Sequence, residues 1–354
     1  MANNRLLKDC PGNGWARIIS GVALMALSGA LSLGAARADE NLDFYKGKIV
    51  RLVNGGSAGS GYDLYSRMLA PYFEKKLGAT VIVEARPGAG MMIAMNHVAV
   101  APADGLTMML APGEGALLAK LVDDPALRFD LAKYGILARV NTAPRVLIVN
   151  PKAPYNTVAD LLKQTKPLQI GANGKTDAAS DTSAVFCHAL KLQCKITIGY
   201  KSSRDFALAA IRGEVEGTIL VEDSSARYAQ GGQLRGVVVT ARERSRLMPD
   251  VPTVYEATKL DKEATWWLDF REDVRKIGRL LVVPPDMPPA RLAFLRKVSK
   301  EILTDPEALK DFSAKQQPAL YGEPDEMLKI IQNVTNLTPE RRKEVKHVIM
   351  EKFY

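Results

Sequence analysis

The chain has 354 residues, of which 48 are lysine or arginine and 39 are aspartate or glutamate, so its formal net charge is +9. The basic residues are spread along the chain. No dense lysine and arginine stripe with interleaved aromatic residues occurs, so we expect no nucleic-acid partner. The length suggests two domains, because one domain usually holds roughly 100–200 residues.

Residues 1–38 have the pattern of a secretory signal peptide. Basic residues between positions 5 and 17 precede an apolar run from Ile18 to Leu33, and Ala36-Arg37-Ala38 is a small-x-small cleavage site. A membrane anchor is the alternative, but the apolar run is shorter than the roughly 20 residues that a spanning helix needs. We predict export and cleavage after Ala38.

Strand and helix patterns alternate over most of the remaining chain. Most strand candidates are continuous Val, Ile, Leu and Met runs, which are typical of strands buried on both faces of a parallel sheet. They lie at Ile49–Val53, Thr80–Glu84, Leu106–Leu110, Gly135–Val140, Val146–Val149, Gln169–Ala172, Lys195–Ile198, Gly217–Val221, Gly236–Val239 and Arg279–Val283. Helix patterns between them lie at Tyr62–Leu77, Met91–Val100, Gly115–Leu121, Val158–Gln164, Ser183–Leu192, Asp205–Ile211 and Ser224–Ala229. This alternation predicts an α/β fold with mostly parallel sheets flanked by helices.

The last seventy or so residues read as helices after a proline-rich connector, Pro284–Pro289. The helix patterns there are Ala290–Leu303, Pro306–Ala314, Pro324–Val334 and Pro339–Met350. Two crossings between strands, near Asn141–Pro144 and Met248–Pro252, describe a hinge between two α/β lobes. We predict that residues 39–141 and 247–354 form lobe 1 and that residues 142–246 form lobe 2.

Two cysteines follow the leader, Cys187 and Cys194. An oxidising compartment favours a disulfide between them. Two buried thiols are the alternative, because the sequence gives no Cα distance.

The most informative motif is the glycine-rich turn Gly55–Asp63, which joins a strand to a helix. Such a turn exposes backbone N–H groups at the positive end of a helix, which suits a carboxylate or a phosphate. Asp63 would buttress the loop or cap the helix, because a carboxylate repels an anion. A plain tight turn is the alternative, and the glycine order is the reverse of a dinucleotide fingerprint. The residues that could present amides and hydroxyls to an anion are Gly55, Gly56, Ser57, Gly59 and Ser60.

Further candidate ligand-binding residues follow later strands, at the sheet edge where α/β folds bind ligands. They are Gly88, Ala89 and Gly90 in the second strand–helix turn, Gly171, Asn173, Gly174, Lys175 and Thr176 in a second-lobe loop, and Tyr200 and Asp223 at the ends of later strands. Lys175 could pair with a ligand carboxylate, or it could be a solvated loop lysine. The second turn could equally be a simple helix entry.

Nothing in the sequence indicates catalysis. Glu222 and Asp223 form an acid pair, but no histidine lies near them in the sequence and their spacing matches no known metal loop. His97 and His188 lie among apolar helix neighbours, which is typical of packing residues. We therefore expect no catalytic residue, no metal and no cofactor.

Six short motifs, in order along the chain, resemble one family. They are Gly55–Asp63, Val83–Gly90, Ala101–Thr107, Gly171–Gly174, Gly199–Lys201 and Leu247–Thr253. Together they resemble the signatures of Bug-type periplasmic solute-binding proteins of tripartite tricarboxylate transporters. The resemblance implies a two-lobed Venus-flytrap fold in the periplasm, a small carboxylate held in the cleft largely by loop amides and hydroxyls, and delivery to a membrane permease.

Two departures from the family pattern keep the ligand open. The first loop reads Gly-Ser-Gly-Tyr-Asp instead of the commoner Gly-Gly-Ser-Thr-Asp, and the second loop, Gly171–Ser183, is longer than usual. The sequence resembles a divergent branch with Gly-Tyr-Asp-Leu-Tyr at its first helix. Two other functions stay open: a binding protein that reports to a membrane receptor, and a secreted enzyme that uses the glycine-rich loop for a phosphorylated substrate. We expect a monomer.

Overall fold

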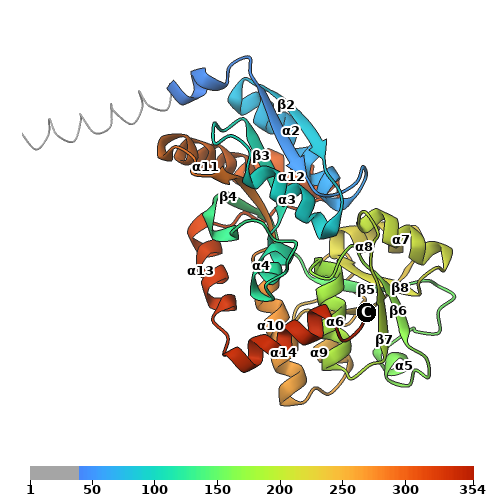
Figure 1. The fold of residues 1–354 in the computed structure, drawn as a ribbon. Helices are drawn as coiled ribbons and strands as arrows, with labels where there is room; N and C mark the ends of the chain where they lie inside the picture. The colour runs from blue at the N-terminus through green and yellow to red at the C-terminus, as the bar shows by residue number, and fades with distance from the viewer. Residues whose placement is uncertain (1–39) are drawn as a thin grey trace, which may run out of the picture.

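The computed structural model describes residues 40–354, and the predicted signal peptide and its cleavage site lie outside these residues. The described chain forms two separate sheets with helices around them, one above the other in Figure 1. Each of the ten predicted strands is present, with ends that differ by two residues or fewer. No helix in this part of the chain is long and apolar enough to cross a membrane.

The first sheet contains the strands from both ends of the chain. Its strands are β1 (Ile49–Asn54), β2 (Thr80–Ala85), β3 (Thr107–Pro112), β4 (Tyr134–Asn141) and β10 (Arg279–Pro285). Their order is β2-β1-β3-β10-β4. β1 is parallel to β2 and β3, whereas β10 runs antiparallel to β3 and β4. β3 is buried at every position, as a central strand covered on both faces should be.

The second sheet repeats this plan. Its strands are β5 (Arg145–Val149), β6 (Leu168–Gly171), β7 (Cys194–Thr197), β8 (Gly217–Val221) and β9 (Arg235–Val239), in the order β7-β6-β8-β5-β9. β6 is parallel to β7 and β8, and β5 is antiparallel to β8 and β9. The antiparallel strand of each sheet, β10 or β5, follows a passage of the chain from the other sheet. The predicted fold class, α/β with two lobes and mostly parallel sheets, is confirmed.

Helices cover both sheets. On the first sheet, α2 (Gly61–Leu77) packs on β1 and β2, while α11 (Pro289–Thr304) packs on β4 and on α2 and α12 (Pro306–Ala314). Further helices are α3 (Met92–Ala99), α4 (Gly113–Leu121), α5 (Val158–Leu162), α6 (Ala178–Ala189), α7 (Ser203–Arg212), α8 (Glu222–Gln230), α9 (Val254–Ala257), α10 (Lys262–Arg275), α13 (Pro324–Thr335) and α14 (Pro339–Met350). Every expected helix is present.

The sequence analysis missed α10, and its burial pattern shows why. The helix buries Ala264, Trp267, Leu268, Arg271 and Val274, which recur at the three- and four-residue spacing of one helical face. Arg271 stands in the middle of that face and is 4% exposed. An amphipathic helix is recognised in a sequence by its apolar stripe, and the buried arginine interrupts that stripe.

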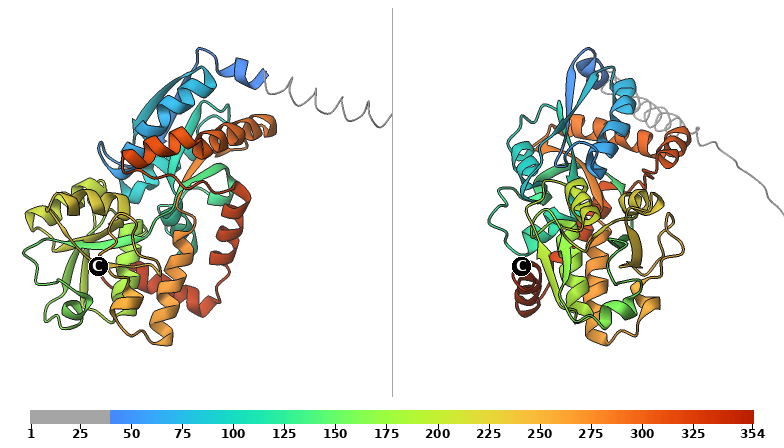
Figure 2. Two further views of the ribbon diagram at one scale, coloured as in Figure 1. Left: turned by 180° about the vertical axis from the view of Figure 1, so that it is seen from behind. Right: turned by 90° about the vertical axis from the view of Figure 1, so that its right-hand side faces the viewer.

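The C-terminal helices connect the two lobes. α10 and α14 both pack against α6 of the second lobe, and α13 lies between them and β4 of the first. Figure 2 shows α13 and α14 running along the outside of the molecule from the first lobe to the second. At the edge strand β7, the Ile196 N–H donates to the Phe353 carbonyl at 2.8 Å. The predicted residue boundaries of the lobes stay a prediction.

The structure decides between the two alternatives for the cysteines. Cys187 and Cys194 form a disulfide, with their Cα atoms 6.3 Å apart. It joins α6 to the start of β7, so it ties a helix of the second lobe to the edge of its sheet.

Candidate functional site

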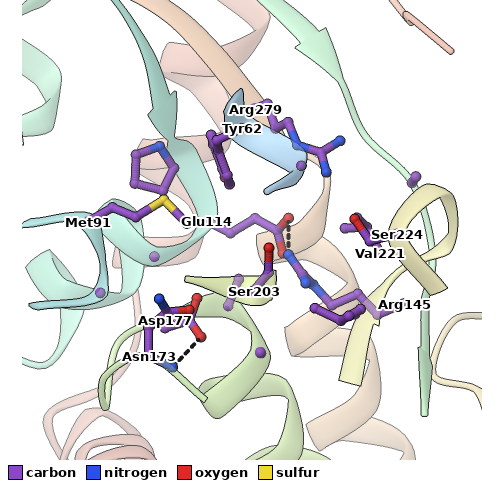
Figure 3. A pocket seen from close by; sticks show the side chains of 18 of the residues that line it. Tyr62, Met91, Glu114, Arg145, Asn173, Asp177, Ser203, Val221, Ser224 and Arg279 are labelled. Carbon is purple, nitrogen blue, oxygen red and sulfur yellow. Dashed lines mark hydrogen bonds and ion pairs between the residues drawn. The ribbon is translucent and has the colours of Figure 1, made fainter. Parts of the chain in front are cut away.

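A cavity lies between the two lobes, where loops and helix ends of both sheets face each other (Figure 3). From the first lobe it is lined by Gly61, Tyr62, Gly90, Met91, Pro112, Glu114, Gly115, Asn141 and Arg279. From the connection and the second lobe it is lined by Thr142, Ala143, Arg145, Asn173, Asp177, Ala178, Ala179, Ser203, Phe206, Leu220, Val221 and Ser224. Open α/β sheets bind ligands at this kind of crevice, outside the strand ends.

The loops of the two lobes touch around this cavity, so the structure is a closed form. The Arg204 guanidinium donates to the Ala58 carbonyl at 3.1 Å, and Ser57 and Ser202 share a hydroxyl–hydroxyl hydrogen bond. On another side, the Thr176 hydroxyl donates to Asp124 Oδ2 at 2.9 Å. These contacts join the two lobes on two sides of the cavity.

Arg279, the first residue of β10, brings a buried cation to the cavity. Its Nη1 donates to Asn141 Oδ1 at 2.8 Å and to Asp223 Oδ2 at 2.9 Å. The guanidinium carbon lies 4.4 Å from the ring centre of Tyr65 and 5.4 Å from that of Tyr62. Burial alone would lower the pKa of Arg279, but Asp223 raises it, so the arginine stays charged. The pair links β10 of the first lobe to α8 of the second.

A second buried charge cluster lies at the cavity and joins residues of the two lobes. The Glu114 carboxylate, at the start of α4, accepts hydrogen bonds from Arg145 Nη2 at 2.9 Å and from Arg271 Nη2 at 2.6 Å. Arg271 Nε also donates to Asp181 Oδ1 at 2.6 Å. Burial would raise the pKa of Glu114, but the two guanidinium groups lower it to about 2. Burial raises the pKa of Asp181 to about 7 in spite of Arg271.

Asn173 and Asp177 form a polar corner on the second-lobe side of the cavity. Asn173 is 4% exposed, and neither its Oδ1 nor its Nδ2 has a hydrogen-bond partner among residues 40–354. The Asp177 carboxylate accepts the Asn173 backbone N–H at 3.2 Å, and burial raises its pKa. Within the described chain, no arginine or lysine forms an ion pair with Asp177. Buried polar groups of a folded protein are normally paired, so the Asn173 amide is available to hydrogen-bond a ligand or a water molecule in the cavity.

The first predicted loop lies beside the cavity and packs mainly against protein atoms. A Cβ on Gly55 would meet Met91 Cβ at 2.3 Å, and one on Gly56 would meet Ser60 Oγ at 2.1 Å. The Gly59 N–H donates to Asp63 Oδ2 at 2.8 Å, so Asp63 buttresses the loop as expected from the sequence. The cavity lining begins one residue after Ser60, at Gly61.

The other predicted site residues divide into two groups. Gly90 and Asn173 line the cavity, and a Cβ on Gly174 would lie 3.2 Å from the Gly90 nitrogen, so these two loops meet across the cleft. Gly88 and Ala89 flank Gly90 without lining the cavity, and Gly171 and Tyr200 lie against Phe206. Asp223 pairs with Arg279, and Thr176 with Asp124. All fifteen residues stay predictions as ligand contacts.

Lys175 points away from the cavity. Its ammonium group donates to the Met350 carbonyl at 2.7 Å and lies 5.0 Å from the ring centre of Tyr354. It is not among the lining residues. In this closed form, Lys175 ties the second-lobe loop to the C-terminal segment.

The sequence analysis missed the charged lining residues Arg145, Arg279 and Glu114. Arg145 and Arg279 each stand at the first position of a buried strand, directly after a passage between the lobes. A charged residue at the start of an apolar run is usually interpreted as a solvated strand end. Its position next to a predicted hinge is the signal that could have found both arginines.

Residues 40–354 contain no group of three or more His, Cys, Asp and Glu side chains that could hold an ion. The acid pair Glu222 and Asp223 serves other partners. The Ser245 hydroxyl donates to Glu222 Oε2 at 2.6 Å, and Asp223 accepts from Arg279 and from the Tyr65 hydroxyl.

Comparison with known proteins gives a consistent picture. Residues 65–345 match the family described as tripartite tricarboxylate transporter family receptor. The protein BugT of Bordetella pertussis is 23% identical over 308 residues, which cover 86% of this chain and 91% of that protein. The periplasmic binding protein BugD superposes with a TM-score of 0.71 at 21% identity, covering 86% of this chain and 98% of its own. Rhodopseudomonas palustris Rpa4515, solved with adipate, gives 0.71 at 20% identity, with 85% and 97% covered.

The family match spans well over half of the chain and confirms the family that the six sequence motifs resemble. The assignment to a Gly-Tyr-Asp-Leu-Tyr branch of that family stays a prediction. The family and the structural neighbours are solute-binding proteins and not enzymes. The chain therefore belongs to the tripartite tricarboxylate transporter receptor family and is a periplasmic solute-binding protein.

Proposed function

We propose that this protein captures a small organic carboxylate in the cavity between its lobes and delivers it to the membrane subunits of a tripartite tricarboxylate transporter. In this proposal it acts as a monomer in the periplasm after cleavage following Ala38. The family match supports the transporter partner, and the adipate-bound neighbour supports a carboxylate ligand. Only the closed form would dock productively on the permease.

One observation carries this proposal: a buried guanidinium at a helix N-terminus inside a closed interlobe cavity. A Cβ on Gly61, the first residue of α2, would lie 3.4 Å from Arg279 Nη2. The positive end of α2 and the guanidinium therefore meet at one place in the cavity wall, and both favour a negative group. Closure lowers the local dielectric and so strengthens each charge–dipole contact with the ligand.

The test of binding is a thermal-shift screen of the purified protein, unfolded and refolded to remove any bound molecule. The panel contains mono-, di- and tricarboxylates, with nucleotides and inorganic phosphate as controls. A ligand that binds only the folded state adds about 2.7 kcal/mol of stability at a hundredfold excess over its dissociation constant. A shift with carboxylates alone is expected, and a shift with nucleotides or phosphate alone would contradict the proposal.

The test of delivery is uptake of the ligand by cells in which the gene is deleted. We expect uptake to fall to background and to return when the wild-type gene is restored. Undiminished uptake in the deletion strain would contradict delivery, and it would leave a sensing role for the same binding site.

A further inference from the structure

The buried charges around the cavity compensate one another. Three arginines are paired with three carboxylates by the ion pairs Arg145–Glu114, Arg271–Glu114, Arg271–Asp181 and Arg279–Asp223. Asp177 adds a fourth carboxylate, which forms no ion pair with an arginine or lysine of the described chain. Arg227 adds a fourth arginine: its Nη2 donates to Ser224 Oγ at 3.1 Å, and it forms no ion pair within residues 40–354. The site therefore holds no surplus positive charge with which to receive a ligand of two or three negative charges.

A dicarboxylate would bring a second negative charge into this closed space. The idealised cost of taking an unpaired charge out of water is large, and a nearby like charge increases it. One carboxylate can be received at Arg279 and the start of α2, where an arginine and a helix N-terminus meet. A second carboxylate would approach Glu114 or Asp177, both of which line the cavity.

The corner formed by Asn173 and Asp177 has the opposite preference. Asp177 is 6% exposed and forms no ion pair in the described chain, and both polar atoms of the Asn173 side chain lack a partner there. Figure 3 shows these two side chains at one end of the cavity and Arg279 at the other. An ammonium group has three donors and one positive charge. It would pair with the Asp177 carboxylate and donate to Asn173 Oδ1 at the same time.

Resting on the proposed carboxylate-binding function, we propose that the ligand is a zwitterion with one carboxylate and one amino group, a monocarboxylic amino acid, and not a di- or tricarboxylate. Its carboxylate lies at Arg279 and the α2 N-terminus. Its ammonium group lies at Asp177 and Asn173. The ligand carboxylate then lies at the end of the cavity where Arg227 has no carboxylate partner, and the ammonium group lies at the end where Asp177 has no ion pair. A zwitterion leaves the net charge of the closed site unchanged.

The experiment is isothermal titration calorimetry of the purified, ligand-stripped protein with matched sets of acids. Each set contains a 2-amino acid, its 2-hydroxy analogue and its unsubstituted analogue: alanine, lactate and propionate, and likewise for valine and phenylalanine. Malate, succinate, adipate and citrate represent the multiply charged acids. Loss of one member of a buried charge pair typically costs 2–5 kcal/mol, so the best amino acid should bind about 30-fold or more tightly than its hydroxy analogue and than any of the four multiply charged acids.

Two results would overturn the inference and leave the proposed function in place. One is a di- or tricarboxylate as the tightest ligand, and the other is a hydroxy analogue that binds as tightly as the amino acid. Binding by no carboxylate of any class would contradict the proposed function itself, so the two failures are distinguishable.

A single substitution places the ammonium group. Asp177→Asn keeps an oxygen that can accept the Asn173 N–H but removes the negative charge. We expect affinity for the best amino acid to fall about 30-fold or more while affinity for the dicarboxylates holds or rises. Asp250→Asn, at an exposed loop position, is the matched control and should change neither. Unchanged amino-acid affinity in folded Asp177→Asn would overturn the proposal, and if that variant does not fold, the wild-type comparison of amino and hydroxy acids decides.

Discussion

Gly115→Ala should weaken ligand binding without harming the fold. Gly115 lies in α4 of the first lobe, and an added Cβ would stand 2.6 Å from the Thr176 carbonyl oxygen of the second lobe. The lobes must then separate at this point or distort the second loop. Overpacking of this kind typically costs about 1–3 kcal/mol, which corresponds to a dissociation constant raised about 5- to 100-fold.

The same substitution should leave the ligand-free protein at least as stable as the wild type. Alanine is a better helix former than glycine by about 1 kcal/mol, and we expect Gly115 and Thr176 to lie apart when the lobes open without ligand. The affinity is measured by titration calorimetry and the stability by thermal melting without ligand. Gly231→Ala is the matched control, because its Cβ would lie 3.6 Å or more from its neighbours. Wild-type affinity in Gly115→Ala would refute the assignment of this contact to ligand-driven closure.

Three further predictions concern stability. Reduction of the Cys187–Cys194 disulfide should lower the free energy of unfolding by about 2 kcal/mol, because the bridge closes only a short loop; an unchanged urea midpoint with reductant would contradict this. Asp223→Ala should lower the free energy of unfolding, measured in urea, by about 3–5 kcal/mol, because it leaves the Arg279 guanidinium buried and unpaired. A decrease of less than about 1 kcal/mol would show that water or another group solvates the guanidinium. The folded-state pKa of Glu114 is lowered to about 2, so its stabilising contribution is present above pH 4.5 and is lost as the pH falls toward 2. In Glu114→Gln the free energy of unfolding should therefore fall less steeply between pH 4.5 and pH 2 than in the wild type. An equal slope in both proteins would contradict the ion pairs.

The order of the strands in the chain could be predicted because most of them are buried on both faces. β3, β5 and β8 are covered at every position, so each appears in the sequence as a continuous apolar run. Their lateral order and the antiparallel insertion of β5 and β10 could not be predicted, since they depend on contacts between distant segments. Two lobes could be predicted because two passages between strands indicate crossings, and because the six motifs resemble a two-lobed family.

The position of the site could be predicted better than its chemistry. Glycines at strand–helix turns indicate close backbone approach, and Gly90 and Gly174 do meet across the cleft. Only the position next to the predicted hinge marks Arg145 and Arg279 in the sequence. Nothing marks Arg271, because an arginine within a helix carries no sign of whether it is solvated or buried. The partners of all three arginines come from other elements, so the compensated charge cluster exists only in the folded protein.

Lys175 shows that a residue predicted to contact the ligand from the sequence can have a protein partner instead. A lysine in a glycine-rich loop suggests an anion contact, and the sequence supplies no reason to expect the C-terminal residues nearby. In the structure the Met350 carbonyl accepts its hydrogen bond and the Tyr354 ring faces its ammonium group. The contact depends on α14 reaching the second lobe, which no local pattern shows.

The central claim is that the interlobe cavity holds the ligand, and Asn173→Leu tests it most directly. Because both polar atoms of Asn173 are buried without a partner in the described chain, leucine, which is similar in size, should leave the melting temperature of the ligand-free protein the same or higher. The titration of the best carboxylate should then show affinity reduced about tenfold or more, because a hydrogen-bonding side chain in the site is lost. Asn333→Leu, on the exposed face of α13, is the control and should bind as the wild type does. Wild-type affinity in folded Asn173→Leu would place the ligand somewhere other than this cavity.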